Sequence, residues 1–140
     1  MRDVVESARL THEGAMRVLR AAMDKAMEMG VPQCIAVTDA SGRLLTFVRM
    51  DGAKFLSIGT SIRKAMTAAS GRAPTGSLDA EHAVNLGLVS EGRLTNLKAG
   101  IPIVIEDEVV GGVGVSSGSG EQDLEVALAG VAALADAKRW

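Results

Sequence analysis

Two acidic residues near the C-terminal end of the chain are candidates for acid–base chemistry. Glu121 and Asp123 directly follow the glycine- and serine-rich stretch Gly111–Gly120. Paired carboxylates exchange protons with a substrate when their environments separate their pKa values. Lys64 and Arg72 are cations that would bind a substrate carboxylate. These four side chains are consistent with a cofactor-independent enzyme acting on a small organic acid or an aromatic-catabolism intermediate.

The glycine- and serine-rich stretch is a second candidate, as one wall of a ligand pocket. Gly112, Gly114 and Gly118 are spaced one residue too widely for the dinucleotide-binding pattern. Ser119 and Gln122 predict a helix-capping box, which is a purely structural use of the stretch. Backbone amides in such turns also bind small carboxylates, so both interpretations stay open. The predicted ligand-binding residues are Gly114, Ser116, Ser117, Gly118 and Gly120.

The two histidines, His12 and His82, are too far apart in sequence to predict a zinc site of HxxxH or HExxH type. A single histidine is enough for an axial ligand of haem, and His12 is the candidate for that role. The simpler interpretation of His12 is a solvated residue at a helix start. Met50 and Met66 are interpreted as core filler, and Cys34 as a buried, inert thiol.

The composition narrows the class of protein. A chain of 140 residues is long enough for one domain, residues 1–140, with its own core. The formal charge of -2 argues against a nucleic-acid partner, and no apolar run reaches membrane-spanning length. One cysteine permits no internal disulfide, which is compatible with the cytoplasm. We therefore expect a cytoplasmic protein with a small-molecule ligand, no nucleic acid and no membrane partner.

Apolar periodicity predicts the elements that position these residues. Helices are expected over Thr11–Gly30 and Phe55–Ser70 and on the apolar face from Leu124 to Leu134, with a short helix or flap over Leu78–Leu88. Strands are expected over Gln33–Asp39, Arg43–Arg49, Arg93–Leu97, Ile101–Glu106 and Val109–Ser116. The order α-β-β-α-(α)-β-β-β-α contains hairpins instead of βαβ units. It predicts an α/β (α+β) fold with an antiparallel sheet flanked by helices.

The helix that carries Lys64 and the segment Gly114–Asp123 are expected to line one cavity. Both combine small residues, which allow close approach of a ligand, with charged ones. A neighbouring subunit is a candidate to complete that cavity.

Several short motifs together resemble one known family. They are Leu10-Thr11, Gly30–Pro32, Val37–Gly42, Arg49–Ala53, Lys64-Ala65, Pro74-Thr75, Gly100–Ile103 and Gly111–Asp123. On these motifs the chain resembles the haem-binding GlcG/HbpS-type family and the C-terminal domain of PduO-type proteins, from Leu10 to about Leu134.

The resemblance implies a five-stranded antiparallel sheet and assembly into homo-oligomers, dimers or larger. It makes haem the leading candidate ligand, while other members are associated with catabolic pathways without a settled reaction. Three positions depart from the family pattern: Gly71, Ala99 and Asp107. Ala99 stands where members commonly have glycine, and it is expected to stiffen a loop near the pocket.

Overall fold

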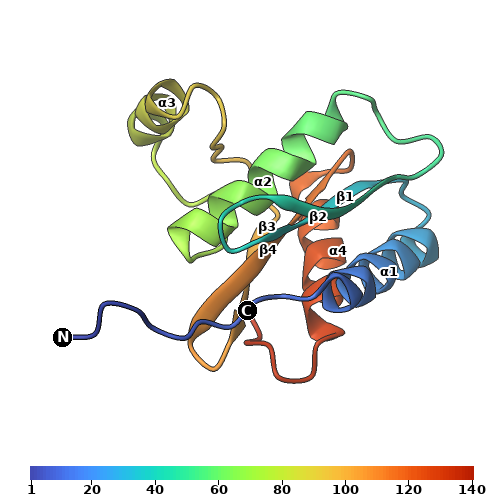
Figure 1. The fold of residues 1–140 in the computed structure, drawn as a ribbon. Helices are drawn as coiled ribbons and strands as arrows, with labels where there is room; N and C mark the ends of the chain where they lie inside the picture. Colours follow the sequence, from blue (N-terminus) through green and yellow to red (C-terminus); the bar gives the residue numbers. More distant parts are fainter.

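The computed structural model describes residues 1–140 and contains four helices and four strands. The elements are α1 (His12–Met29), β1 (Cys34–Asp39), β2 (Leu44–Arg49), α2 (Ser57–Gly71), α3 (Ala80–Val89), β3 (Gly100–Ile105), β4 (Glu108–Ser116) and α4 (Gly120–Ala132). Figure 1 shows α3 standing apart from the other helices, at the far side of α2 from α1. No helix combines the length and the apolar character needed to cross a membrane.

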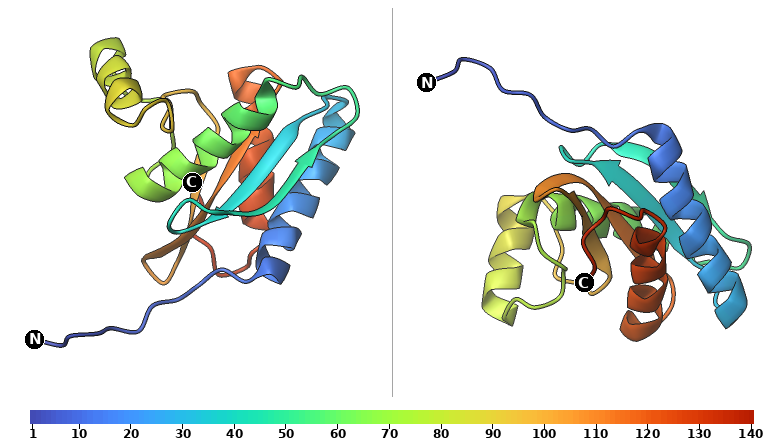
Figure 2. Two further views of the ribbon diagram at one scale, coloured as in Figure 1. Left: turned by 45° about the horizontal axis from the view of Figure 1, so that its top comes forward. Right: turned by 90° about the horizontal axis from the view of Figure 1, so that it is seen from below.

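The four strands form one antiparallel sheet in the order β2-β1-β4-β3. Helices α1 and α4 cover one face of this sheet and α2 covers the other (Figure 2). The core under α1 and α4 is aliphatic, with Ile35, Val113 and Ile103 almost fully buried. The antiparallel α+β architecture predicted from the order of elements is therefore confirmed.

The expectation of a fifth strand, over Arg93–Leu97, is wrong. Backbone amides in this segment are bonded by hydroxyl side chains instead of a neighbouring strand: Thr95 N donates to Thr67 Oγ1, and Leu94 N donates to Ser90 Oγ. Because these groups already have partners, the segment has no need of a β ladder. The sequence of the segment carries no signal of such side-chain bonds.

The helix ends follow the predicted chemistry closely. Thr11 caps α1, and Gly30 ends it in the left-handed conformation. Ser119 and Gln122 form the predicted capping box at the start of α4. The uncertain segment after α2 is the helix α3, capped by Asp79. Helix α2 begins at Ser57, two residues later than expected.

Glycines allow α2 to lie unusually close to the sheet. A Cβ on Gly114 would overlap the carbonyl oxygen of Ser61, and a Cβ on Gly112 would overlap that of Ala65. The strand face below α2 therefore has almost no side-chain layer. Part of the glycine-rich sequence is explained by this packing, because any larger residue would separate the helix from β4.

Candidate functional site

Lys64 and Asp123 form an ion pair in the interior, where their side chains are each 4% exposed. The Lys64 Nζ atom lies 3.1 Å from Asp123 Oδ2 and donates a second hydrogen bond of 2.7 Å to the carbonyl oxygen of Val115. The other carboxylate oxygen of Asp123 accepts a bond of 2.9 Å from the amide of Gly118. The pair thus connects α2, the end of β4 and the start of α4.

Burial controls the electrostatics of this pair. Removal of the Lys64 ammonium from water lowers its pKa, and the charge and hydrogen bond of Asp123 partly oppose that effect. Both charged groups form their hydrogen bonds with other groups of the protein. Lys64 therefore lies next to the Gly114–Asp123 segment, as predicted, but the two are joined by an internal ion pair.

The turn between β4 and α4 uses its own amides. Gly118 N is shared between Asp123 Oδ1 and Gln33 Oε1, and Ser119 N donates to Gln122 Oε1. Ser117 has a positive φ of 107°, and its hydroxyl accepts a bond from the amide of Lys54. An anion bound to this turn would have to displace these internal partners.

The other predicted ligand-binding positions of this stretch lie at different depths. Gly114 lies beneath α2, Ser116 is buried, and Gly120 is half-buried as the first residue of α4.

The remaining predicted acid and base residues lie apart from the buried pair. Glu121 is exposed and pairs with Lys98 at 3.2 Å, and its own backbone amide together with Lys98 lowers the pKa of its carboxyl group. Arg72 is exposed after α2 and lines a hollow that also contains Asp107 and Glu108. Glu121 and Arg72 thus lie in different surroundings from each other and from the Lys64–Asp123 pair.

Gln33 is a buried polar residue that the sequence analysis did not single out. It is fully buried, its Oε1 atom accepts from Gly118, and its Nε2 atom has no hydrogen-bond partner. A buried amide without a partner for one donor is costly. The only sequence signal was a polar residue just before an apolar strand.

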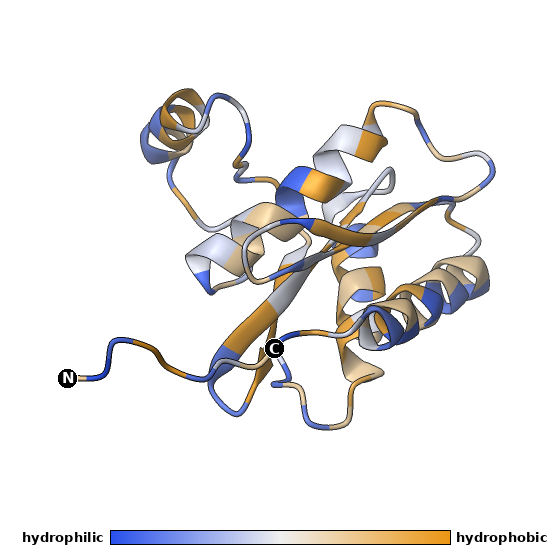
Figure 3. Ribbon diagram, in the orientation of Figure 1, coloured by the Kyte–Doolittle hydropathy of each residue, from blue (hydrophilic) through white to orange (hydrophobic).

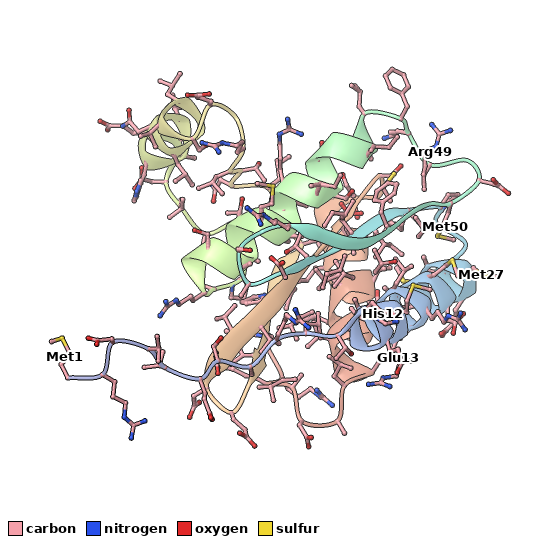
Figure 4. The ribbon with its side chains drawn as sticks, in the orientation of Figure 1. Met1, His12, Glu13, Met27, Arg49 and Met50 are labelled. Atoms are coloured by element: carbon pink, nitrogen blue, oxygen red, sulfur yellow. The ribbon has the colours of Figure 1, made fainter.

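His12 lies in a surface hollow of about 590 Å³ at the start of α1. The hollow is also lined by Arg9, Leu10, Thr11, Glu13, Asp39 and Leu45. Figure 4 shows His12 and Glu13 next to each other in the first turn of the helix. The imidazole of His12 is exposed and makes no hydrogen bond or ion pair with the protein. Both of its nitrogens are therefore available to a ligand.

A second hollow, of about 290 Å³, lies between the β1–β2 turn, α2 and the segment after α3. It is lined on one side by Met66 and on the other by Arg93. Met66 thus borders a surface hollow and lies outside the main core. No group of three or more His, Cys, Asp or Glu side chains is arranged to hold a metal ion.

The fold and these hollows define a small α+β domain in which one exposed histidine, His12, lines a surface hollow. The sequence model of the family described as "Haem degrading protein HbpS-like" matches residues 10–132, and the chain belongs to this family. The recognised GlcG/HbpS-type resemblance is thereby confirmed.

Known proteins of this type cover most of the chain. Protein GlcG of Escherichia coli K12 is 37% identical over 110 residues, which are 76% of this chain and 81% of GlcG. The crystal structure of HbpS matches with a TM-score of 0.85 at 34% identity, over 94% of each chain. The structure titled "PduOC:Heme Complex" matches with a TM-score of 0.85 at 26% identity, over 94% of this chain and 98% of that one.

Proposed function

We propose that this protein binds haem in the hollow beside His12, with the His12 imidazole as axial ligand. The observation that carries the proposal is an exposed histidine, free of protein partners, in a hollow of about 590 Å³. Membership of the HbpS-like family and the similarity to a haem complex of PduOC support haem as the ligand. Haem requires only one protein donor, so the absence of a metal-binding cluster is no obstacle.

The residues around His12 fit the chemistry of the haem group. Leu10 and Leu45 supply apolar contact, and Arg9 supplies a cation for a propionate carboxylate. The Oδ1 atom of Asp39, which also lines the hollow, already accepts bonds from Ser41 N, Ser41 Oγ and Arg43 N. When bound, haem would supply an iron centre for redox or small-ligand chemistry, while these residues hold and orient it.

Titration of the purified protein with haemin tests the proposal. We expect a saturable shift of the Soret band with about one haem per chain. His12→Ala should abolish the axial-ligand signature, while His82→Ala should leave it unchanged. His82 is a matched control because it is the other histidine of the chain and is exposed on α3. Saturable binding with the same spectrum in His12→Ala would overturn the role of His12, and no saturable binding would overturn haem as the ligand.

The alternative is an enzyme that uses Glu121 or Asp123 as acid and base, with Lys64 or Arg72 binding a substrate carboxylate. It has less support from the geometry. Asp123 and Lys64 bind each other in the interior, and Glu121 pairs with Lys98 at the surface. Binding of a ligand at the rim needs none of these contacts to break.

We also propose that the protein assembles into homo-oligomers. The support is a set of large apolar side chains on the surface of one chain, including Phe55, Leu56 and Leu88.

A further inference from the structure

The hollow of about 290 Å³ beside α2 is lined by a single charged side chain, that of Arg93, and we call it the Arg93 hollow. Arg93 Nε donates a hydrogen bond of 3.0 Å to the carbonyl oxygen of Ser90, which is the only hydrogen bond of this side chain. Arg93 also belongs to none of the ion pairs of the chain. The two terminal nitrogens of the guanidinium group are therefore left to a partner from outside the chain. Their spacing matches the two oxygens of one carboxylate.

The turn that carries Arg93 is held in place by bonds within the chain. Ser90 is 8% exposed, and its hydroxyl group accepts a hydrogen bond from the amide of Leu94. From α2, Arg63 Nε donates a hydrogen bond to the carbonyl oxygen of Gly92. Figure 3 shows hydrophilic residues in this turn where it leaves α3. A charged group on a fixed turn loses less conformational freedom when it binds a ligand than one on a flexible loop.

The other walls of the Arg93 hollow supply an apolar surface and a free hydroxyl group. Met66 and Leu94 form the apolar part of the lining. Ser70 also lines the hollow, and its hydroxyl group has no hydrogen-bond partner in the chain. By contrast, the hydroxyl groups of Ser61 and Thr67 donate to backbone carbonyls of the same helix. An apolar lining with a few placed polar groups is typical of a small-molecule site.

The charges around the Arg93 hollow favour an anion with one negative charge. No carboxylate is among the side chains that line it. Asp39 precedes the lining residues Ala40 and Ser41, but it lines the hollow beside His12 instead. One guanidinium group balances the charge of one carboxylate, whereas a phosphate group with two charges needs further cations.

We propose that the Arg93 hollow binds a small monocarboxylate with a short apolar chain. The guanidinium group of Arg93 pairs with the carboxylate, Ser70 donates a hydrogen bond to it, and the apolar chain packs on Met66 and Leu94. The volume is at the small end of the range for ligand pockets, which suits acids of about four to six carbon atoms. The Arg93 hollow shares no lining residue with the hollow beside His12, so this inference does not rest on haem binding.

Fluorine NMR with trifluorobutyrate as the probe tests the class of ligand. Trifluorobutyrate carries one carboxylate on a short apolar chain, and trifluorobutyramide has the same shape without the charge. The acid should bind saturably with a Kd of about 1 mM, and the amide should bind weaker by about tenfold or more. Absence of saturable binding of the acid, or equal binding of acid and amide, would overturn the proposal. Inorganic phosphate should not displace the probe at equal concentration, and displacement would overturn the assignment to carboxylates.

Two variants test the location of the site. Arg93→Gln keeps a donor for the carbonyl oxygen of Ser90 but removes the charge, so the affinity for trifluorobutyrate should fall by about tenfold to a hundredfold. Ser70→Phe keeps Arg93 but fills the hollow, and it should also weaken binding. Arg20→Gln is the matched control, because Arg20 is exposed on α1, on the opposite face of the sheet.

The control should bind the probe as the wild type does, and all three variants should keep the wild-type circular dichroism spectrum and the response to haemin. Unchanged affinity for trifluorobutyrate in Arg93→Gln or in Ser70→Phe would overturn the assignment to the Arg93 hollow, whatever the outcome of the haemin titration.

Discussion

The ammonium group of Lys64 lies 3.1 Å from the carboxylate of Asp123, and each of the two side chains is only 4% exposed. The partners come from α2 and from the first turn of α4, two helices on opposite faces of the sheet. The ion pair therefore links the two helices at the end of β4, where the carbonyl oxygen of Val115 accepts the second hydrogen bond from Lys64.

We predict that removing one partner of this pair is far more damaging than removing both. Lys64→Met leaves a buried carboxylate with the Gly118 amide as its main partner and should cost about 3–5 kcal/mol of unfolding free energy. Lys64→Met/Asp123→Leu removes both charges and should recover a large part of that loss. Urea denaturation measures both values. Lys98→Met is the matched control, because it breaks the exposed pair with Glu121 and should change stability little.

A second prediction concerns acid stability at the β1–β2 turn. Burial raises the pKa of Asp39, but hydrogen bonds from Ser41 and Arg43 outweigh it and hold the pKa below 3.8. The folded state therefore binds fewer protons at this carboxyl than the unfolded state does. Its stabilising contribution is present above pH 3.8 and is lost as the pH falls through the lower folded-state value.

Asp39→Asn tests this sign. The wild type should be more stable than the variant at neutral pH, and the two should converge in acid, as followed by urea unfolding at each pH. Asp136→Asn serves as control because Asp136 is an exposed carboxylate without a hydrogen-bond partner. A gap between wild type and Asp39→Asn that stays constant with pH would contradict the prediction.

The glycine face beneath α2 predicts opposite results for two Gly→Ala changes. Gly114→Ala places a methyl group against the backbone of α2 and should destabilise by about 3 kcal/mol or more. Gly87→Ala adds a methyl group with no atom within 4 Å, inside α3, and should stabilise by about 0.5–1 kcal/mol. Thermal unfolding of both variants is sufficient, and a tolerated Gly114→Ala would show that α2 can move outward freely.

We predict that a substitution of Gln33 leaves the free energy of unfolding nearly unchanged, although this residue is fully buried. Gln33→Met has similar volume and removes the Nε2 donor that lacks a partner. The Gly118 amide loses one acceptor but keeps Asp123. We expect the unfolding free energy to change by no more than about 1 kcal/mol. A much larger loss would mean that Nε2 has an ordered water as partner.

The helices and strands could be predicted from the sequence wherever the residues that determine them are close together in the chain. Periodicity and capping residues such as Thr11 and Ser119 identified the helices, and the Asp39-Ser41-Gly42 turn identified the first hairpin. The segment Arg93–Leu97 was mistaken for a strand because its backbone partners, among them Thr67, lie far away in sequence. Side-chain bonds of that range leave no periodic pattern.

The candidate site was less predictable for the same reason. The sequence identified Lys64 and Asp123 as important charged residues, but it could not show that they neutralise each other. The hollow at His12 depends on the approach of the β1–β2 turn to α1, which brings Asp39 and Leu45 beside a residue more than 25 positions earlier. Tertiary contacts, which leave no local pattern in the sequence, determine which side chains line the same hollow.

The side-chain-free contact between α2 and the sheet has a consequence for how this scaffold diversifies. Backbone lies against backbone at Gly112 and Gly114, so no guest molecule fits between these layers. The space open to a ligand lies at the periphery instead, where residues such as Arg9 and His12 are exposed and line a surface hollow. Peripheral residues of this kind can be replaced without loss of the fold, so specificity is free to change while the architecture is retained.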